Sequence, residues 1–465
     1  MTIAEWKIDI SKMEGPCYLA LANEIARAID SGELAPGAQL PTHRQLADRL
    51  GITVGTVSRA YALARKRRLI VGEVGRGTFV QGRTLAERNS SYIPHQANQG
   101  LDLSTSGSPL FEGLNQQLSQ SLAQVCDRVL TLPLHKYPPD SGILSHRLAG
   151  VTWIARSGLE VSAEQVLITN GAQEALAVCL TVLAKHGDTI LTEDLTYSGL
   201  KSLATIYGLR LQGVAMDEYG IVPDALENAA KQHGARVVYL QPTIHNPTAV
   251  AIPEARRRQI ADVAKRCNLT VIEDDVSAAC LTQRPMPIFA LIPDQCIYVT
   301  SLSKSMSPTL RIGYLAASAP LLNNLVDAFR TLTLGVSPIN AEIATTLISS
   351  GGASDIARTY LNAMGDSLDI ARQTLPEGVV QGQPGACFFW LKLPGHWNVD
   401  NFVRAAKQLG IVLPYADSFL ADDTGGCQGV RVSLNPALQP DTFRRALLQL
   451  EELMSGHQQL RPVVI

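Results

Sequence analysis

Four side chains that can bind or react lie close together after a short apolar stretch. Residues 296–300 (Cys-Ile-Tyr-Val-Thr) are apolar and rich in β-branched side chains, which predicts a buried strand. Ser301, Ser303 and Lys304 follow, and Arg311 comes seven residues after the lysine. A lysine at the carboxyl end of a buried strand lies where α/β sheets bind ligands, and its amine can attack a carbonyl. The serines and Arg311 can bind a phosphate, arginine by a two-pronged contact.

Together these groups are what a protein needs to hold pyridoxal 5'-phosphate as an imine of Lys304. A solvated turn at the end of a strand would contain the same short motif. The residues that follow the other predicted strands therefore decide between the two interpretations.

The surrounding sequence predicts a mostly parallel sheet. Strand patterns occupy residues 165–169, 189–192, 237–241, 270–273, 296–300 and 312–316. Helical patterns at 172–184 and 253–267 indicate right-handed crossovers between parallel strands. Small or polar residues follow five of these strands: Gly171, Ala172 and Gln173, then Tyr197, Asn246, Asp274 and Lys304. Because ligand groups in an open parallel sheet belong at the carboxyl edge, we expect these residues to meet there.

Each of these residues suits one part of the cofactor. Residues 171–173 open a helix, whose free N–H groups and dipole favour a phosphate. Tyr197 can stack on the pyridine ring, and Asn246 can donate to the ring hydroxyl. Asp274 can bind the pyridinium nitrogen and keep it charged, which preserves the ring as an electron sink.

The acidic run Glu273-Asp274-Asp275 has an alternative interpretation as a metal site, because adjacent carboxylates often ligate metals. No histidine or further carboxylate cluster with suitable spacing supports it, so we expect no metal.

The composition is that of an ordinary globular protein. The chain has 465 residues, of which 46% are hydrophobic and 18% charged. No apolar run approaches the length of a membrane span, and the first residues lack an export signal. The eight cysteines are scattered without a C-x-x-C pair, which favours reduced thiols. We expect a cytoplasmic protein without structural zinc and without a membrane partner.

The charge is unevenly distributed along the chain. Residues 1–83 carry twelve Lys or Arg and eight Asp or Glu, a balance of +4, whereas the remainder carries 28 and 34, a balance of −6. A small basic domain joined to a larger acidic one suggests a polyanion partner for the first domain only.

The basic head has the pattern of a winged helix-turn-helix. A first helix is predicted around residues 21–29, and Thr42 with Gln45 forms a capping box for a second helix. Thr53 caps a third helix, and two short strands at 69–71 and 78–80 form the wing.

The third helix would enter the major groove of double-stranded DNA with Thr53, Thr56, Ser58 and Arg59. The wing sequence Gly75-Arg76-Gly77 would let the backbone approach while its arginine reaches a minor groove. A protein-binding or merely structural three-helix unit is the alternative.

This region resembles the GntR-type DNA-binding domain, whose pattern it matches in Leu40-Pro-x-x-Arg44, in Thr56-Val-x-Arg59-Ala-Tyr and in Gly75-x-Gly77-Thr-Phe-Val. The resemblance implies that Arg44, Thr53, Thr56, Arg59 and Arg76 contact DNA, with Gly77 in the wing. The predicted domains are 1–82 for this head, 83–100 for a polar linker and 101–465 for the body.

Residues from about 100 to 450 resemble a fold-type I, class I aminotransferase, and the whole chain resembles the MocR-type regulators. The resemblance implies that Lys304 is the Schiff-base lysine, that Ser301, Ser303 and Arg311 bind the phosphate, and that Asp274, Asn246 and Tyr197 have the ring contacts given above. It also implies that Tyr137 reaches the phosphate of a partner subunit and that Arg431 binds a substrate α-carboxylate.

Two residues depart from the family pattern. Val276 stands where the family usually has tyrosine, and Ala249 stands where it usually has glycine. The missing phenol removes a second donor to the ring hydroxyl, which counts against efficient transaminase chemistry.

The fold class expected is α/β: a winged helix-turn-helix followed by a fold-type I body with a mostly parallel sheet and a smaller C-terminal α+β subdomain. The leading hypothesis is a homodimeric, pyridoxal phosphate-dependent regulator that binds a DNA operator and senses a small amine or amino acid. A working aminotransferase with an accessory head is the second hypothesis, and a DNA-binding protein with an inactive dimerising body is the third.

Overall fold

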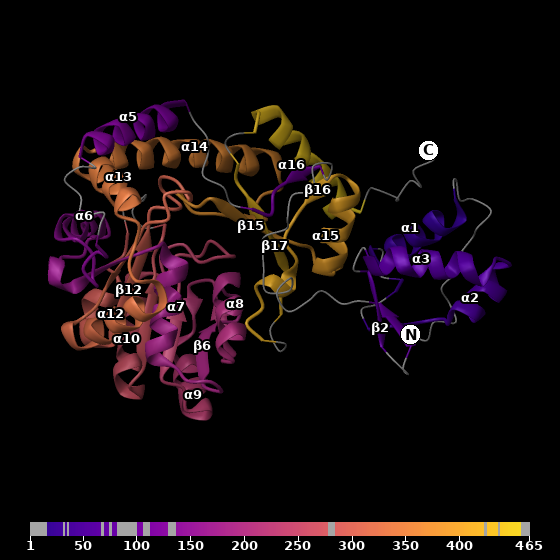
Figure 1. The fold of residues 1–465 in the computed structure, drawn as a ribbon, viewed down its shortest axis with the longest axis horizontal. Helices are drawn as coiled ribbons and strands as arrows, with labels where there is room; N and C mark the ends of the chain where they lie inside the picture. Colours follow the sequence, from indigo (N-terminus) through magenta and orange to yellow (C-terminus); the bar gives the residue numbers. More distant parts are fainter. Residues whose placement is uncertain are drawn as a thin grey trace.

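A computed structural model describes residues 16–30, 33–34, 37–66, 69–73, 77–80, 100–105, 112–128, 136–277, 284–422, 426–435 and 438–456. Figure 1 shows a small N-terminal unit (indigo) and a larger unit made by the rest of the chain. Within the described residues, no helix has both the length and the apolar character needed to cross a bilayer.

The N-terminal unit is the predicted winged helix-turn-helix. Its elements are α1 (Cys17–Asp30), β1 (Gln39–Leu40), α2 (His43–Leu50), α3 (Val54–Lys66), β2 (Ile70–Glu73) and β3 (Gly77–Val80). The capping box opens α2: the backbone N–H of Gln45 donates to Thr42 Oγ1 over 3.3 Å, and the N–H of Thr42 donates to Gln45 Oε1 over 3.0 Å. Gly51 ends this helix in the left-handed conformation.

The wing contains a strand that the sequence did not predict. β1 pairs antiparallel with β3, so the described strands follow the order β1-β3-β2. A strand of two residues is too short to show the alternation that identifies longer strands.

The large unit is built on a mostly parallel sheet, as predicted. Among the described residues seven strands form it, in the spatial order β5 (Val166–Thr169), β13 (Gly313–Ala316), β12 (Cys296–Ser301), β11 (Thr270–Asp274), β10 (Val237–Leu240), β6 (Thr189–Glu193) and β7 (Arg210–Val214). Only β13 is antiparallel to its neighbours. β7 was not predicted, because this edge strand is half-buried and has no continuous apolar run.

Helices surround this sheet in Figure 1. They include α6 (Leu144–Ala155), α7 (Ala172–Leu183), α8 (Ser198–Tyr207), α9 (Pro223–His233), α10 (Glu254–Cys267), α11 (Ile288–Leu291) and α12 (Ala319–Thr333). Apart from the edge strand β7, the sheet strands are almost completely buried, as expected for parallel strands covered on both faces.

The rest of the chain forms the smaller subdomain. It contains α5 (Glu112–Arg128), α13 (Pro338–Ser349), α14 (Gly352–Thr374), α15 (Val399–Gln408), α16 (Pro440–Met454) and an antiparallel sheet of β14 (Val380–Gln381), β15 (Phe388–Lys392) and β17 (Gly429–Ser433). In Figure 1 the long helix α14 runs from α13 to this sheet. β4 (Leu101–Asp102), the first strand after the head, pairs in parallel with β16 (Ile411–Val412).

Two helical glycines give a matched test of packing in this fold. A Cβ added at Gly150 in α6 would lie 2.5 Å from Cδ1 of Tyr314, which is fully buried in β13. We expect Gly150→Ala to lower the free energy of unfolding by about 1–3 kcal/mol, since the ring has no room to move. Gly365 in α14 has no described atom within 4 Å of the added Cβ, so Gly365→Ala should raise it by about 0.5–1 kcal/mol. Urea unfolding of both variants measures the difference, and equal effects would contradict this account of the packing.

Candidate functional site

The carboxyl edge of the large sheet borders a cavity of about 470 Å³. The predicted residues that line it are Ala172, Gln173, Tyr197, Asn246, Asp274, Ser301, Ser303, Lys304, Arg311 and Arg431. Gly171 lies beside the cavity, against Arg311. The folded chain therefore brings together predicted residues as far apart in sequence as Ala172 and Arg431, which are separated by 259 positions.

Arg311 reaches this edge because β13 runs against its neighbours. The first residue of β13, Gly313, pairs with Ser301 and Thr169, the last residues of β12 and β5. The segment that leads into β13 therefore lies at the carboxyl edge of the parallel strands. Nη2 of Arg311 donates to the carbonyl oxygen of Asn170 over 2.8 Å, which fixes the guanidinium beside the start of α7.

Gly171 is required where it stands. Its φ of +88° is in the left-handed region, and an added Cβ would lie 2.8 Å from Nη2 of Arg311. This close approach keeps Arg311 and the N-terminus of α7 side by side, next to Ser301 and Ser303. The backbone N–H of Ser303 donates to Ser301 Oγ over 3.3 Å. A guanidinium, two hydroxyls and a helix N-terminus together suit the binding of a phosphate.

Tyr197 and Gln173 pack over Gly199. A Cβ on Gly199 would lie 2.3 Å from Cε1 of Tyr197 and 2.4 Å from Oε1 of Gln173, so only glycine leaves both side chains in place. Nε2 of Gln173 donates to the carbonyl oxygen of Gly199 over 3.0 Å. Burial raises the pKa of Tyr197 to about 12, so it remains a neutral phenol on the cavity wall.

Asp274 is a buried carboxylate with one oxygen satisfied and one open. Its Oδ2 accepts hydrogen bonds from the hydroxyl of Tyr239 over 2.6 Å and from Nε2 of Gln241 over 3.1 Å. Its Oδ1 is buried and has no hydrogen-bond partner among the described residues. Burial raises the pKa of Asp274 to about 6, although the two hydrogen bonds oppose the shift. An acceptor of this kind fits the protonated ring nitrogen of pyridoxal phosphate.

Gln241 is a site residue that the sequence reasoning missed. Besides donating to Asp274, its Oε1 accepts from the backbone N–H of Asn246 over 3.2 Å. It therefore fixes the relative positions of Asp274 and Asn246. Gln241 ends a predicted strand like the residues that were singled out, so the same rule would have found it.

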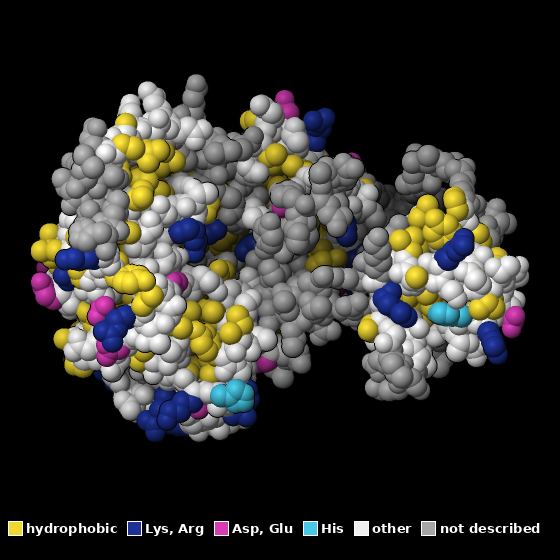
Figure 2. Space-filling model, viewed as in Figure 1, with side chains coloured by type: hydrophobic (Ala, Val, Ile, Leu, Met, Phe, Trp, Pro, Cys, Tyr) yellow, Lys and Arg dark blue, Asp and Glu magenta, His cyan; other side chains and the backbone are white. Residues whose placement is uncertain are grey.

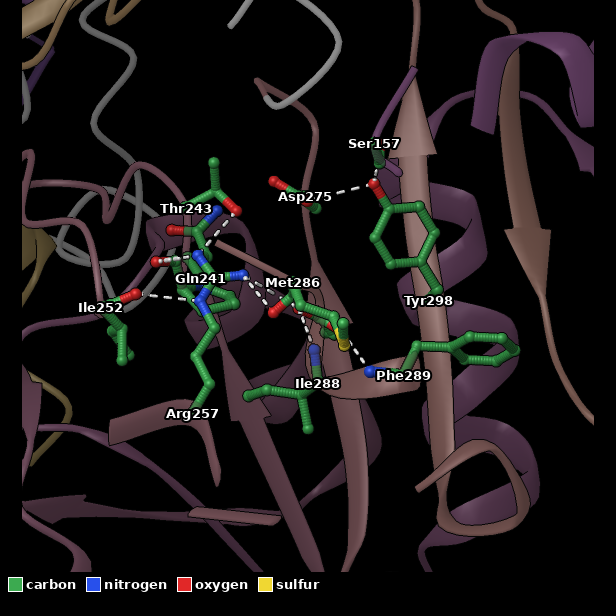
Figure 3. Close-up of polar contacts among 12 residues, drawn as sticks. Ser157, Gln241, Thr243, Ile252, Arg257, Asp275, Met286, Ile288, Phe289 and Tyr298 are labelled. Atoms are coloured by element: carbon green, nitrogen blue, oxygen red, sulfur yellow. Dashed lines mark hydrogen bonds and ion pairs between the residues drawn. The ribbon is translucent and has the colours of Figure 1, made fainter. Parts of the chain in front are cut away.

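Glu273 and Asp275 point away from Asp274, because successive side chains on a strand alternate between its faces. Oε1 and Oε2 of Glu273 accept from the backbone N–H groups of Ile288 and Phe289 over 3.0 and 2.8 Å. The hydroxyl of Tyr298 donates to Oδ2 of Asp275 over 3.1 Å, as Figure 3 shows. No group of His, Cys, Asp or Glu in the described chain is arranged to hold a metal ion.

Arg257 compensates the charge of this buried cluster. Its side chain is completely buried, and Nη1 lies 3.7 Å from Oε1 of Glu273. Its other N–H groups donate to backbone carbonyls at Pro242, Ile252 and Met286, and Figure 3 shows Arg257 between these segments. Burial nevertheless raises the pKa of Glu273 to about 7, and the charge of Arg257 opposes that shift.

Arg431 lies in β17 on the opposite wall of the cavity. Its side chain is buried, and Nη1 donates to Oδ1 of Asn246 over 2.9 Å while Nη2 donates to the carbonyl oxygen of Ser104 over 2.6 Å. The rings of Phe388 and Phe419 lie 5.5 and 4.9 Å from its guanidinium carbon. Burial lowers the pKa of Arg431 to about 10, and Nε has no partner in the described part of the chain.

Tyr137 does not join the cavity of its own chain. Its side chain is 77% exposed and lines a separate surface hollow with Lys136, Pro138 and residues 333–338. This position leaves its predicted contact with a partner subunit as a prediction. Val276, by contrast, lines the main cavity, so no phenol stands at that point of its wall.

The predicted DNA-contacting residues lie on the N-terminal unit. Arg44 of α2 and Arg59 of α3 are exposed, and Lys and Arg side chains are visible on the face of this unit in Figure 2 (right). Thr53 Oγ1 accepts from the backbone N–H of Thr56 over 3.2 Å and so caps α3, as predicted. Gly77 opens β3, whereas Arg76 lies outside the described residues.

Ser58 makes a contact within the head, and its predicted position towards the major groove stays a prediction. Its hydroxyl lies 3.2 Å from Nδ1 of His43, and the ring of His43 packs edge-on against Tyr61. Ser58 therefore joins α3 to α2, a contact that no sequence pattern indicated.

Comparison with protein families gives two matches along the chain. The family described as "Aminotransferase class I and II" matches residues 100–450, and "Bacterial regulatory proteins, gntR family" matches residues 17–80. A relative named "Uncharacterized HTH-type transcriptional regulator YdeF", from Bacillus subtilis, is 31% identical over 453 residues, which cover 97% of this chain and 96% of YdeF.

Enzymes are also similar to the body. The 2-aminoadipate transaminase of Thermus thermophilus is 28% identical over 308 residues, covering 64% of this chain and 76% of that protein. The crystal structure of LysN, an α-aminoadipate aminotransferase from Thermus thermophilus complexed with N-(5'-phosphopyridoxyl)-L-leucine, is 26% identical with a TM-score of 0.67, covering 77% of this chain and 93% of that one.

Because the carboxylate of Asp274 is only half satisfied, we expect Asp274→Asn to have opposite effects on stability with and without pyridoxal phosphate. A carboxylate whose pKa is raised in the folded protein contributes stability below its unfolded pKa of about 4, and this contribution is lost as the pH rises through about 6. At about pH 7.5 we expect Asp274→Asn to raise the free energy of unfolding of the cofactor-free protein by about 1–3 kcal/mol. Added pyridoxal phosphate should stabilise the wild type far more than the variant, because the variant cannot pair with the ring nitrogen as an anion.

Thermal unfolding with and without pyridoxal phosphate measures both effects. Asp262→Asn, an exposed change on α10, is the matched control and should behave as the wild type. A cofactor-free Asp274→Asn protein that is less stable than the wild type would contradict this account of the carboxylate.

Proposed function

Because the chain belongs to the aminotransferase class I and II family and carries a gntR-family unit at its N-terminus, we propose that it is a MocR-type transcriptional regulator. In this proposal it holds pyridoxal 5'-phosphate and senses a small amine or amino acid by imine exchange at Lys304. The observation that carries the proposal is the cavity in which Lys304, Asp274 and Arg431 converge. The relative matched along almost the whole chain is named as an HTH-type regulator, which favours sensing over turnover.

The cavity offers a group for each part of the cofactor. Pyridoxal phosphate, when bound, supplies an aldehyde that condenses with primary amines. Arg311, Ser301 and Ser303 would bind its phosphate together with the N-terminus of α7. Oδ1 of Asp274 would accept from its ring nitrogen, and Tyr197 would cover its ring.

Lys304 is the exchangeable amine in this proposal. It is released as a primary amine when an incoming amine takes its place, and the two protons lost by the incoming nitrogen end on the lysine nitrogen. The carboxylate of an amino acid would meet Arg431, whose planar guanidinium suits two-pronged binding. Tyr137 would reach the phosphate of the partner subunit in a homodimer.

The head supplies the DNA-binding part of the function. α3 would lie in the major groove with Arg59, Thr53 and Thr56 at its exposed start, and Arg44 would add a contact from α2. Two heads on one dimer would bind two half-sites of an operator.

An active aminotransferase is the second candidate, because the 2-aminoadipate transaminase resembles the body. The valine at position 276 counts against it, since its side chain supplies no second donor for the ring hydroxyl. Turnover of an amino donor with a keto acid separates the two candidates. A purified protein without the absorbance of a lysine–cofactor imine would leave only an inactive dimerising body.

Replacing Lys304 tests the sensing mechanism. We expect Lys304→Ala to fold and bind DNA but to lose the influence of the effector on DNA binding, because no exchangeable imine remains. Absorbance titration with a panel of amines and amino acids identifies an effector, and gel shift then compares the variants. Lys392→Ala, an exposed change in β15, is the matched control and should respond as the wild type. A full effector response in Lys304→Ala would leave only non-covalent sensing.

Replacing Arg59 tests the DNA contact. We expect Arg59→Ala to weaken operator binding by about 1–3 kcal/mol if the arginine reads a base. Arg27 is the control in the same unit: it is already bonded to Glu24 and Glu33, so Arg27→Ala should change affinity far less. Fluorescence anisotropy with paired and single half-sites measures both effects. Equal affinity for single and paired half-sites would argue against a dimeric operator complex.

A further inference from the structure

The main chain at Ser104 contacts Arg431 directly. The carbonyl oxygen of Ser104 accepts from Nη2 of Arg431 over 2.6 Å, and both residues are buried. The next residue, Thr105, lines the cavity. The residue proposed to meet the effector is thus bonded to a segment that is also part of the cavity wall.

The same segment is the first part of the body after the head. Gly100 follows residues 81–99, which join the two units in sequence. From there the N–H of Leu101 donates to Gly410 O over 2.7 Å, the N–H of Leu103 donates to Val412 O over 2.9 Å, and Leu103 O accepts from the N–H of Ser433 over 2.9 Å. The segment from the start of the body to the cavity is therefore only six residues long, Gly100 to Thr105, and it is bonded to the smaller subdomain through Leu101 and Leu103.

The direction of the Ser104 carbonyl is set by its own segment. Oδ1 of Asp102 accepts from the backbone N–H of Ser104 over 2.8 Å and from its hydroxyl over 2.6 Å. This local turn holds the peptide so that the carbonyl faces Arg431. Asp102 itself does not line the cavity, so it can be changed without altering the cavity wall.

A carboxylate that binds Arg431 must compete with this carbonyl. Two-pronged binding along the side of a guanidinium uses Nε and Nη2 together. Nε is buried and has no partner among the residues described, whereas Nη2 is held by Ser104 and Nη1 by Asn246. The carboxylate would therefore take over the nitrogen that Ser104 holds, and a buried carbonyl left unpaired is unfavourable.

We propose that the carboxylate of the effector displaces the Ser104 carbonyl from Arg431 and thereby loosens residues 100–105, which carries the signal from the cavity towards the head. This inference rests on the proposed function and specifies its effector as an amino acid rather than a simple amine. An amine without a carboxylate condenses at the cofactor but leaves Ser104 bonded to Arg431. Imine formation and signalling are therefore separable.

Pairs of ligands that differ only in the carboxylate test the inference on the full-length protein loaded with pyridoxal phosphate. L-Alanine is compared with ethylamine, and L-leucine with 3-methylbutylamine, each at a concentration that gives a saturated absorbance change. Hydrogen–deuterium exchange is then measured on the peptide that contains residues 100–105, with a peptide from α16 as the internal reference. We expect the amino acids to raise exchange at the amides of Leu101 and Leu103 by about tenfold, the factor that corresponds to roughly 1.4 kcal/mol. The matched amines should leave this exchange unchanged.

Each outcome decides a different claim. Equal exchange with the amine and the amino acid, when both change the absorbance, overturns the inference and leaves the proposed imine exchange intact. An absorbance change by an amino acid without faster exchange at 100–105 also overturns the inference alone. No absorbance change with any amine or amino acid counts against the proposed function itself.

Two variants test the contact without any ligand. Arg431→Gln removes the donor to Ser104, so exchange at Leu101 and Leu103 should rise to the level that the amino acid produces in the wild type. Arg372→Gln is the control, because Arg372 also donates to a backbone carbonyl, that of Gly382 over 3.0 Å, but lies away from the cavity lining. Asp102→Ala, which releases the turn but removes no side chain from the cavity lining, should raise exchange in the same way. Wild-type exchange in both Arg431→Gln and Asp102→Ala overturns the inference.

Discussion

The candidate site depends on the buried carboxylate of Asp274, which the protein leaves half satisfied. Tyr239 and Gln241 both donate to the same oxygen of Asp274, a residue that lines the cavity, and the other oxygen is buried without a partner among the described residues. Such a group is unfavourable in a protein interior unless a ligand completes it. The alternation of side chains along β11 allows this arrangement, because it directs Glu273 and Asp275 to the opposite face. There a backbone N–H group and Arg257 contact Glu273, and the hydroxyl of Tyr298 donates to Asp275. The strand thus separates a structural pair of carboxylates from one that is available for binding.

Much of this arrangement could be predicted from the sequence, because ligands bind at the carboxyl ends of the strands in an open parallel sheet. Asp274, Asn246 and Lys304 were chosen as residues that follow apolar runs, and the fold places all three on one cavity. The capping box at Thr42 could also be predicted from the sequence, since it depends on two residues only three positions apart. Local chemistry and a single topological rule were sufficient for these features.

Other features depend on contacts between distant segments, which no local pattern contains. Ser58, which is predicted to face DNA, also has His43 beside it. The bond from Arg431 to Ser104 joins residues 327 positions apart and involves a backbone carbonyl, which has no signature in the sequence. Tyr137 faces outward on a single chain, so its predicted role concerns a second copy. The edge strand β7 was missed because exposure on one side interrupts its apolar pattern.

Arg257 has a consequence for the freedom of the loops around the cavity. Its N–H groups donate to the backbone carbonyls of Pro242, Ile252 and Met286. Pro242 precedes Asn246 and Ile252 follows it, whereas Met286 comes after Val276 along the chain. The loop around Asn246 and the loop that contains Met286, which are separate in the sequence, are therefore both hydrogen-bonded to Arg257. If either loop moves, the other loop or the guanidinium must move with it. Asn246 and the cavity wall at Val276 therefore move less independently than two residues on separate loops would.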